Sequence, residues 1–278
     1  MDGTQMPAAA AAAAMTARYG AGAEPKPGPW NDTLALLLSH RSVRAFKTDR
    51  PPEGTLETLV AAAQSAATSS NLQTWSVVAV DRPEVRAELA TIAGNQKHIE
   101  VCPIFLVFIA DTSRNGRLAA EAGVELAGLP FLESFLVSAI DAALAAQNAV
   151  VAAESLGLAN VYIGALRNDV TRVAELLGLP PGAAPVFGLC LGYAQEGREG
   201  EVKPRLPQAA VLHHETYDAD DAGHRAAYDP RMEDFSRRQE MAGSTWTQRV
   251  IARLGSFRAL HGREKLKEKI IGLGFPLR

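Results

Sequence analysis

The segment Ser39–Thr48 (SHRSVRAFKT) concentrates the side chains best suited to binding an anion. His40, Arg41, Ser42 and Arg44 fall within five consecutive positions, directly after an apolar run. Two interpretations of this spacing are open. Basic residues are common in the last turn of a helix, where they meet the negative end of the helix dipole, so the segment can be a solvated helix end. The alternative is that the cations and the hydroxyl form part of an anion site.

A second pair of cations stands late in the chain, in the stretch VKPRLP. Lys203 and Arg205 flank Pro204, and Pro207 follows, so the proline rings stiffen the loop that presents both charges. Two rigid basic pairs suit a dianionic phosphate, because each charge-assisted hydrogen bond is worth about 1.5–3 kcal/mol. The competing interpretation is a set of scattered, solvated charges.

Three polar stretches lie between these basic segments, each beside an apolar segment. They are ATSSNLQTW (67–75), GNQKH (94–98) and YIGALRN (162–168). The third runs from a strand end into Gly164 and Ala165, where a backbone N–H can approach a flat ligand closely. Each stretch alone is typical of an ordinary turn or helix cap. Together they indicate hydrogen-bond donors around a large planar heterocycle with a phosphate tail.

Several common catalytic motifs are absent from the sequence. No GxGxxG follows a predicted strand and no GxxxxGK[ST] occurs, which disfavours a Rossmann dinucleotide site and a Walker phosphate loop. The absence of GxSxG disfavours a serine hydrolase. His213 and His214 are adjacent, but there is no HExxH and no Cys/His cluster with zinc spacing, so we interpret the pair as a surface strand end and expect no metal.

Composition limits the class of protein. The 278 residues carry 28 basic and 31 acidic side chains, a formal net charge of −3. This near balance argues against a nucleic-acid binder, whose affinity depends on neutralising phosphates. The two cysteines, Cys102 and Cys190, each stand inside an apolar run. Buried thiols are therefore expected rather than a disulfide, which fits a reducing, cytoplasmic location.

The apolar pattern predicts helices that alternate with strands. Helices are expected at 31–39, 51–67, 83–94, 133–158 and 169–180, and strands at 75–81, 103–111, 160–164 and 184–194. The charged tail adds amphipathic stretches at 232–241 and 247–260. This interleaving predicts an α/β or α+β fold with a sheet packed under helices.

Two segments need separate interpretation. The longest helix candidate, Glu133–Leu158, is apolar almost all round and should lie in a core or an interface. A membrane span is the alternative, but Asp141 and Glu154 interrupt it, and no charge-free stretch approaches the roughly 18 residues that a span needs. Residues 1–30 are rich in Ala, Gly and Pro and lack the basic region of a signal peptide. Because Ala and Gly bury little surface, we expect residues 1–30 to be disordered.

Six stretches resemble the flavin-dependent nitroreductase family, especially its branch of NADPH-type, oxygen-insensitive nitroreductases and flavin reductases. They are HRSVRAF, SSNLQ, GNQKH, AAQNAVVAAESLGLANVYIGALRN, PVFGLCLGY and KPRLP, in family order between Leu34 and Val211. The resemblance implies an α+β fold, a three-layer α/β/α sandwich with a mixed, mainly antiparallel central sheet flanked by helices, in an intertwined homodimer. It also implies a single FMN-binding domain over residues 31–278 with a helical C-terminal excursion.

The resemblance further implies one FMN in each groove of the dimer interface. The ribityl phosphate would be bound by His40, Arg41, Ser42, Lys203 and Arg205. Arg44 would lie beside the N1/O2 edge of the flavin, where its charge favours the anionic reduced form. Gln96 would contact the ring or the ribityl chain. The strand end would line the ring with Tyr162, Ile163, Gly164 and Ala165, and the partner chain would contribute Thr68, Ser69 and Asn71.

The activity implied by the resemblance is a ping-pong transfer of two electrons. NAD(P)H gives a hydride to flavin N5, and a quinone, nitroaromatic or free flavin then takes the electrons, with no catalytic acid from the protein. Arg237 and Arg238 are the candidates for the extra phosphate of NADPH, although MAGS (241–244) stands where relatives carry further basic residues. Ala165 also replaces a usual glycine. The alternatives are a flavin sensor or carrier without turnover and a phosphate-ligand binder without flavin.

Overall fold

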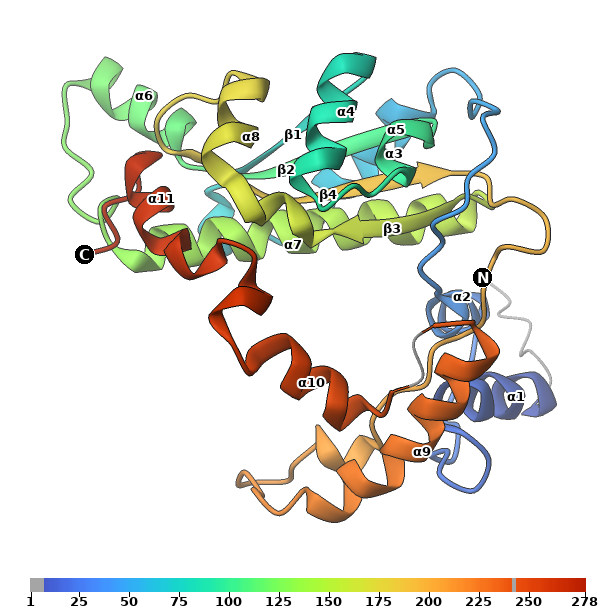
Figure 1. Ribbon diagram of the computed structural model, residues 1–278. Coiled ribbons are helices and arrows are strands. Elements are labelled where there is room, and N and C mark those ends of the chain that lie inside the picture. The colour runs from blue at the N-terminus through green and yellow to red at the C-terminus, as the bar shows by residue number, and fades with distance from the viewer. Residues whose placement is uncertain (1–7, 242–243) are drawn as a thin grey trace. The chain divides into compact units, whose positions relative to one another are not determined.

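The protein is described by a computed structural model that defines residues 8–241 and 244–278 (Figure 1). Its helices are α1 (Ala8–Tyr19), α2 (Asp32–Ser39), α3 (Thr55–Gln64), α4 (Pro83–Ile92), α5 (His98–Val101), α6 (Ser113–Ala122), α7 (Leu132–Ser155), α8 (Val170–Leu177), α9 (Ala222–Arg238), α10 (Trp246–Leu254) and α11 (Leu266–Gly272). Its strands are β1 (Trp75–Ala79), β2 (Ile104–Asp111), β3 (Ala159–Ile163) and β4 (Ala183–Gly192).

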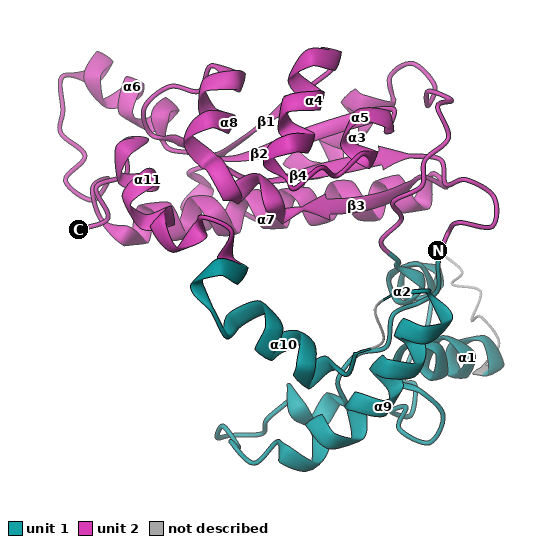
Figure 2. Cartoon of the chain, viewed as in Figure 1, with its two compact units in different colours: residues 1–41, 200–259 teal, residues 42–199, 260–278 magenta. Residues whose placement is uncertain are grey.

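The chain divides into two compact units (Figure 2). Unit 1 comprises residues 1–41 and 200–259, and unit 2 comprises residues 42–199 and 260–278. Neither unit begins at residue 31, so the predicted boundary there coincides with no boundary in the structure. A single domain over 31–278 stays a prediction.

Unit 2 is built on a four-stranded sheet in the order β1-β2-β4-β3, with all three strand pairs antiparallel. The predicted mixed character is limited, among the described residues, to one isolated parallel bridge between Ser42 and Asn160. Strand β2 is buried from Phe105 to Asp111, as its continuous apolar run predicts. Its side chains alternate between two cores, because successive residues of a strand point to opposite faces.

Helices cover both faces of this sheet. On one face, Leu106 and Phe108 pack with α3 and α7, and on the other Phe105 and Val107 pack with α4, α5 and α8. This arrangement agrees with the three layers that were expected. Asn31 caps the N-terminus of α2 by accepting a hydrogen bond from Leu34 N–H. Helices α1, α5, α6 and α11 were not predicted.

Helix α7 is long and apolar enough to cross a membrane by length and composition. In the structure its small residues lie against the sheet and α3, namely Ala142, Ala145, Ala146, Ala149 and Ala153. Alanine allows the helix to approach the strands closely. The buried Asp141 of α7 accepts hydrogen bonds from Ser69 N–H and the Thr74 hydroxyl, both in the same unit. These contacts identify α7 as a core helix of this fold.

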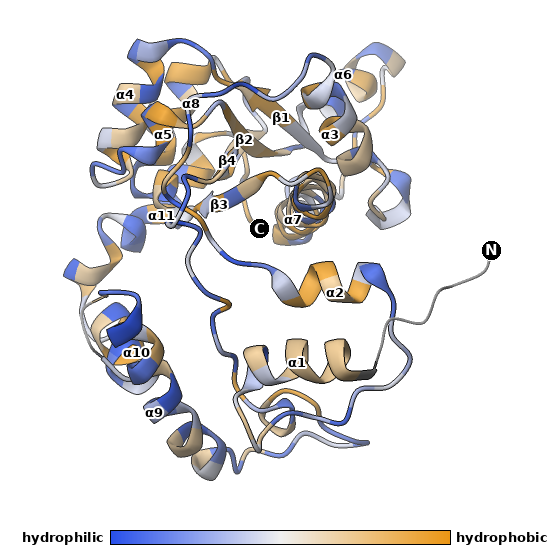
Figure 3. Cartoon of the chain, turned by 90° about the vertical axis from the view of Figure 1, so that its right-hand side faces the viewer, coloured by the Kyte–Doolittle hydropathy of each residue, from blue (hydrophilic) through white to orange (hydrophobic). Residues whose placement is uncertain are grey.

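Unit 1 contains α1, α2, α9 and α10. Tyr228, Met232 and Phe235 on α9 form a small apolar core, which Leu206 and Trp246 extend. Elsewhere α9 carries mainly charged residues interspersed with alanines (Figure 3). Both predicted amphipathic stretches of the tail are therefore helical over most of their length.

The disorder predicted for residues 1–30 is wrong for residues 8–19, which form α1. Residues 1–7 lie outside the described part of the chain. Alanine has the highest helix propensity, and two side chains of this helix are buried, Ala11 and Arg18. The prediction was based on how little surface alanine buries. It did not include the hydrogen bonds from the Arg18 side chain to backbone carbonyls, which hold the helix in place.

Candidate functional site

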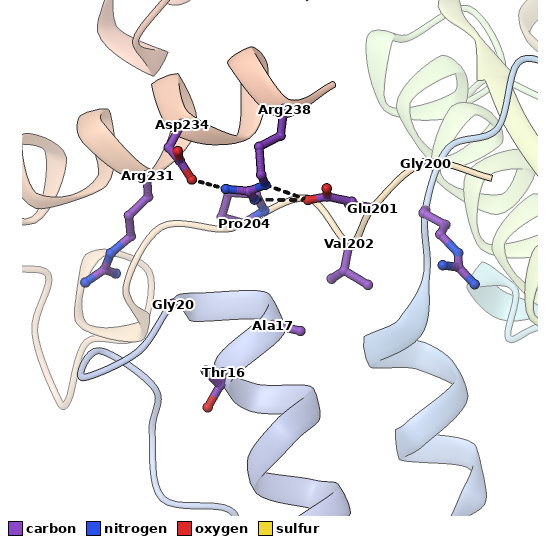
Figure 4. A pocket seen from close by; sticks show the side chains of 11 residues that line it. Thr16, Ala17, Gly20, Gly200, Glu201, Val202, Pro204, Arg231, Asp234 and Arg238 are labelled. Carbon is purple, nitrogen blue, oxygen red and sulfur yellow. Dashed lines mark hydrogen bonds and ion pairs between the residues drawn. The ribbon is translucent and has the colours of Figure 1, made fainter. Parts of the chain in front are cut away.

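The first basic segment begins at the end of α2 in unit 1. His40 follows the helix, and its N–H donates to Leu37 O at 3.4 Å. Its carbonyl accepts a 2.9 Å hydrogen bond from the guanidinium of Arg18. Arg41 is exposed and lines a pocket of about 480 Å³. Figure 4 shows this pocket between α1, the segment 200–204 and α9.

The second basic segment also lies in unit 1. Lys203 Nζ stands 5.8 Å from the centroid of the Phe235 ring, a cation–π contact. Tyr228 Oη donates to Pro204 O at 2.8 Å, and Arg205 Nη1 lies 3.4 Å from the same carbonyl. The loop that presents both cations is therefore held by side chains of α9 as well as by its prolines.

Ser42 and Arg44 belong to unit 2. Ser42 forms the isolated bridge to Asn160 in β3, and Val43 N–H donates to Asn160 O at 2.9 Å. The part of the segment that starts at Ser42 is thereby tied to β3, the strand that runs into Gly164 and Ala165. Arg44 is exposed, and its charge is close enough to His98 to lower the pKa of that imidazole.

The stretch GNQKH joins α4 to α5. Gln96 N–H donates to Ala90 O at 3.1 Å, and Gln96 Nε2 donates to Ala93 O at 2.9 Å. Burial, and to a smaller degree the charge of Arg44, lowers the pKa of His98. Its Nε2 atom is buried and has no hydrogen-bond partner within the described residues. A buried polar atom of this kind needs a hydrogen-bond partner, which a ligand or an ordered water can supply.

The strand end Tyr162–Ala165 leaves the sheet at the edge strand β3. Tyr162 Oη donates to Gln147 Oε1 at 3.3 Å, and burial raises its pKa, helped by the charge of Glu154. Ile163 is buried in the core. Gly164 starts a short 3₁₀ turn, η2 (Gly164–Asp169), where a Cβ atom would lie 3.2 Å from a guanidinium nitrogen of Arg167.

The stretch that contains Thr68 and Ser69 forms a strained loop. Ser70, Asn71 and Gln73 all have positive φ, at 48°, 53° and 49°. Non-glycine residues rarely adopt this conformation, and such residues cluster at binding sites. Asp141 of α7 anchors the loop by accepting hydrogen bonds from Ser69 N–H at 3.2 Å and from the Thr74 hydroxyl at 3.3 Å.

Arg114 of α6 holds the same loop from its other side. Its Nη1 donates to Gln73 O at 2.9 Å, and its Nη2 lies 3.3 Å from Ser76 Oγ. These residues also line part of a pocket of about 420 Å³ with Thr68 and Leu72. Asp141 thus holds the loop at Ser69 and Thr74, and Arg114 holds it at Gln73.

Arg237 and Arg238, the candidates for the NADPH phosphate, are engaged with carboxylates. Arg238 forms an ion pair with Asp234 and a second with Glu201 at 3.0 Å (Figure 4). Arg237 pairs with Asp234 at 2.5 Å. A phosphate would have to compete with these carboxylates. Of the MAGS stretch, residues 242 and 243 lie outside the described part of the chain.

The structure adds three polar residues that the sequence analysis missed: Arg18, Asp141 and Arg114. Arg18 stands in a low-complexity stretch and Asp141 in an apolar helix, so neither belongs to a recognisable motif. The signal that could have identified Arg18 and Asp141 is that each is an isolated charge in an otherwise apolar or alanine-rich helix. Such a charge remains buried only when polar partners satisfy it.

Comparison with known proteins places the chain in a family. The description "Nitroreductase family" matches residues 37–193, and "Nitroreductase family, C-terminal domain" matches residues 203–278. The chain belongs to the nitroreductase family. It is an oxidoreductase of the nitroreductase type, and the family and enzyme class expected from the sequence are confirmed.

Individual nitroreductases are similar over most of their length. FMN reductase (NADPH) of Bacillus subtilis is 41% identical over 80% of this chain and 90% of its own. Oxygen-insensitive NADPH nitroreductase of Salmonella typhimurium is 37% identical over 78% of this chain and 89% of its own. The structure of NfrA2 from B. megaterium superposes with a TM-score of 0.84 at 35% identity, covering 90% of this chain and 100% of that one.

Proposed function

We propose that the chain is an FMN-dependent NAD(P)H oxidoreductase that reduces nitroaromatics, quinones or free flavins. The observation that carries the proposal is the state of the arginines in HRSVR. Arg41 and Arg44 are exposed, and neither forms an ion pair with a carboxylate in the described part of the chain. By contrast, Arg237 and Arg238 are neutralised by acidic neighbours. Uncompensated guanidinium groups are suited to an anionic ligand.

The residues present fit FMN as a ligand. The cations of unit 1 match its phosphate in charge. Arg18 links the segments that present them through hydrogen bonds to the carbonyls of His40 and Lys203. In unit 2, Arg44 and the unsatisfied Nε2 of His98 supply polar groups for a heterocycle. When bound, FMN supplies the hydride and electron-transfer chemistry that no side chain provides.

The proposed roles are those that the family resemblance implies, and they agree with the charge and chemistry of the residues. The phosphate is held by His40, Arg41, Ser42, Lys203 and Arg205. Arg44 stabilises negative charge that develops on the ring, which preorganised charges do effectively. Gln96 and the strand end Tyr162–Ala165 orient the ring with side-chain and backbone groups. Together these residues bind and orient the cofactor.

We also propose that two copies of the chain complete the site. The loop with Thr68, Ser69 and Asn71 is anchored to α7, on one face of the sheet, whereas Gln96 follows α4 on the other face. One copy is therefore expected to supply the loop and the other Gln96. A second support is the apolar stripe on α7, where Leu132, Leu136, Ile140 and Leu144 are all about half exposed. Their spacing of four residues places them on one face of the helix.

Replacing Ile140 by Glu tests the dimer. A charge in the centre of an apolar interface should shift the protein to a monomer in analytical ultracentrifugation, with loss of FMN binding. The matched control is Leu118→Glu on α6, since Leu118 is also exposed. An Ile140→Glu protein that remains dimeric would exclude this face of α7 as the interface.

The electron donor is inferred from relatives and chemistry. Both curated relatives above are named for NADPH, and we propose NADPH or NADH as donor here. The pairing of Arg237 and Arg238 with Asp234 weakens the case for a dedicated 2′-phosphate site. Free, buried Cys102 and Cys190 support a cytoplasmic location. Nucleic acid and membranes are not proposed as partners.

A spectrum followed by reduction tests the function. The purified protein should show flavin absorbance, and NADPH or NADH should bleach it before menadione or a nitroarene restores it. Arg44→Ala should slow reduction about 10²-fold, and Arg41→Ala should mainly weaken FMN retention, by about tenfold or more. A protein that takes up no FMN would refute the proposal. Bound FMN without NAD(P)H oxidation would instead indicate a sensor or carrier.

A further inference from the structure

Helix α1 lies outside the segments that match the nitroreductase family, which are 37–193 and 203–278. Its penultimate residue, Arg18, nevertheless makes several contacts with the rest of unit 1. Arg18 is only 7% exposed although it carries a permanent charge. A buried guanidinium is costly unless its N–H groups are satisfied, so its contacts identify what holds it there.

The guanidinium of Arg18 bonds two segments that are distant in sequence. Its Nη1 donates to Lys203 O at 2.8 Å, and its Nη2 donates to Leu38 O at 2.6 Å and His40 O at 2.9 Å. The planar, forked geometry of arginine allows one side chain to reach all three carbonyls. The Arg18 side chain therefore fixes the backbone at His40 and at Lys203, which belong to the two candidate phosphate-binding segments of unit 1.

The main chain of α1 adds a reciprocal connection. Arg205 N–H donates to Arg18 O at 2.9 Å, and Arg231 Nη1 donates to Tyr19 O at 2.6 Å. The last carbonyls of a helix have no intrahelical partner, so these bonds satisfy groups that would otherwise need water. Lys203 and Arg205 are thus both tied to one residue, the first by the Arg18 side chain and the second by its carbonyl.

We propose that Arg18 is a positioning residue, and that α1 clamps the backbone of His40 and of Lys203–Arg205 so that their side chains are preorganised for a phosphate. The inference rests on the proposed function and extends it to a segment outside the family match. Preorganisation strengthens binding because less conformational freedom is lost when the ligand arrives.

The test compares full-length Arg18→Met and Arg18→Lys proteins with the wild type. Arg18→Met keeps the length and removes the donors, whereas Arg18→Lys keeps the charge but cannot form the fork. We expect the FMN dissociation constant, from fluorescence titration of apoprotein, to rise at least about tenfold in Arg18→Met and less in Arg18→Lys. Amide hydrogen exchange at Arg205 should accelerate in the same order, without any ligand.

The matched control is Arg225→Ala in the same unit. Within the described residues, Arg225 of α9 forms one ion pair, with Asp221 at the start of the same helix, so its loss should change neither FMN affinity nor exchange at Arg205. A merely structural role for Arg18 would lower the melting temperature but leave the FMN affinity of the folded protein unchanged, and that result would overturn the proposal. If Arg18→Met fails to fold, Arg18→Lys decides.

The exchange measurement separates this inference from the proposed function. Wild-type protein that binds no FMN would refute the proposed function and the phosphate role of the clamp with it. Accelerated exchange at Arg205 with unchanged FMN affinity would refute the phosphate role alone. Unchanged exchange at Arg205 in both variants would refute the clamp, whatever the affinity for FMN.

Discussion

Removing the carboxylate of Asp141 should release the strained loop that precedes β1. Asp141 is 2% exposed and accepts hydrogen bonds from Ser69 N–H at 3.2 Å and the Thr74 hydroxyl at 3.3 Å. The first distance is at the long end of the usual range of about 2.7–3.2 Å for N–H···O bonds, and the second exceeds the range of about 2.5–3.0 Å for O–H···O bonds. Each bond is therefore placed near the lower end of the range of about 1.5–3 kcal/mol for bonds to charged groups. Asp141→Ala should therefore lower the free energy of unfolding by about 3 kcal/mol.

Asp141→Asn separates charge from geometry. The carboxamide oxygen can accept from Ser69 N–H, and its NH₂ group can donate to Thr74 Oγ1, so both contacts persist as neutral hydrogen bonds. The expected loss is about 1 kcal/mol. Glu133→Gln on the same helix is the control, because Glu133 is exposed and its loss should cost below about 1 kcal/mol.

Urea denaturation at constant m-value measures these differences, and hydrogen exchange at the Ser69 amide reports the loop directly. Exchange should accelerate in Asp141→Ala, because residues with positive φ return to extended conformations once the anchor is gone. An Asp141→Ala protein within 1 kcal/mol of the wild type, with unchanged exchange at Ser69, would show that the loop does not depend on this carboxylate.

Two further predictions concern His98 and Gly192 of unit 2, the second with a control in unit 1. Burial and Arg44 lower the pKa of His98 below its usual value of about 6.5, so on acidification His98 takes up a proton in the unfolded chain before it does so in the folded protein. The free energy of unfolding should therefore fall as the pH drops below about 6.5. His98→Gln should flatten this pH dependence in urea titrations at several pH values. Gly192→Ala should lower the free energy of unfolding by about 1–3 kcal/mol, because the added Cβ would stand 2.4 Å from Pro103 Cδ. Gly223→Ala is the control: its Cβ would meet open space within α9, so it should be neutral or stabilising. Thermal melts of both variants measure the difference.

Local structure was largely predictable from the sequence. The apolar run of β2 predicted a doubly buried strand, and the helix expected at 169–180 is observed as α8, which ends at a left-handed Gly178 with φ 64°. These features depend on neighbouring residues alone, through side-chain alternation and helix termination. The motifs HRSVRAF and GNQKH also led to the correct family, because their residue types and their order can be read from the sequence without any structural information.

The contacts that assemble the candidate site were decided only in three dimensions. Arg18 and Lys203 are 185 positions apart, and no local pattern records that the guanidinium of one meets the carbonyl of the other. The same holds for Asp141, which occupies an apolar helix and yet anchors a loop more than sixty residues earlier. A sequence determines which groups are available and which segments are helical or extended. Whether a buried charge finds its partners depends on how those segments pack, because partners are then set by distance in space and not along the chain.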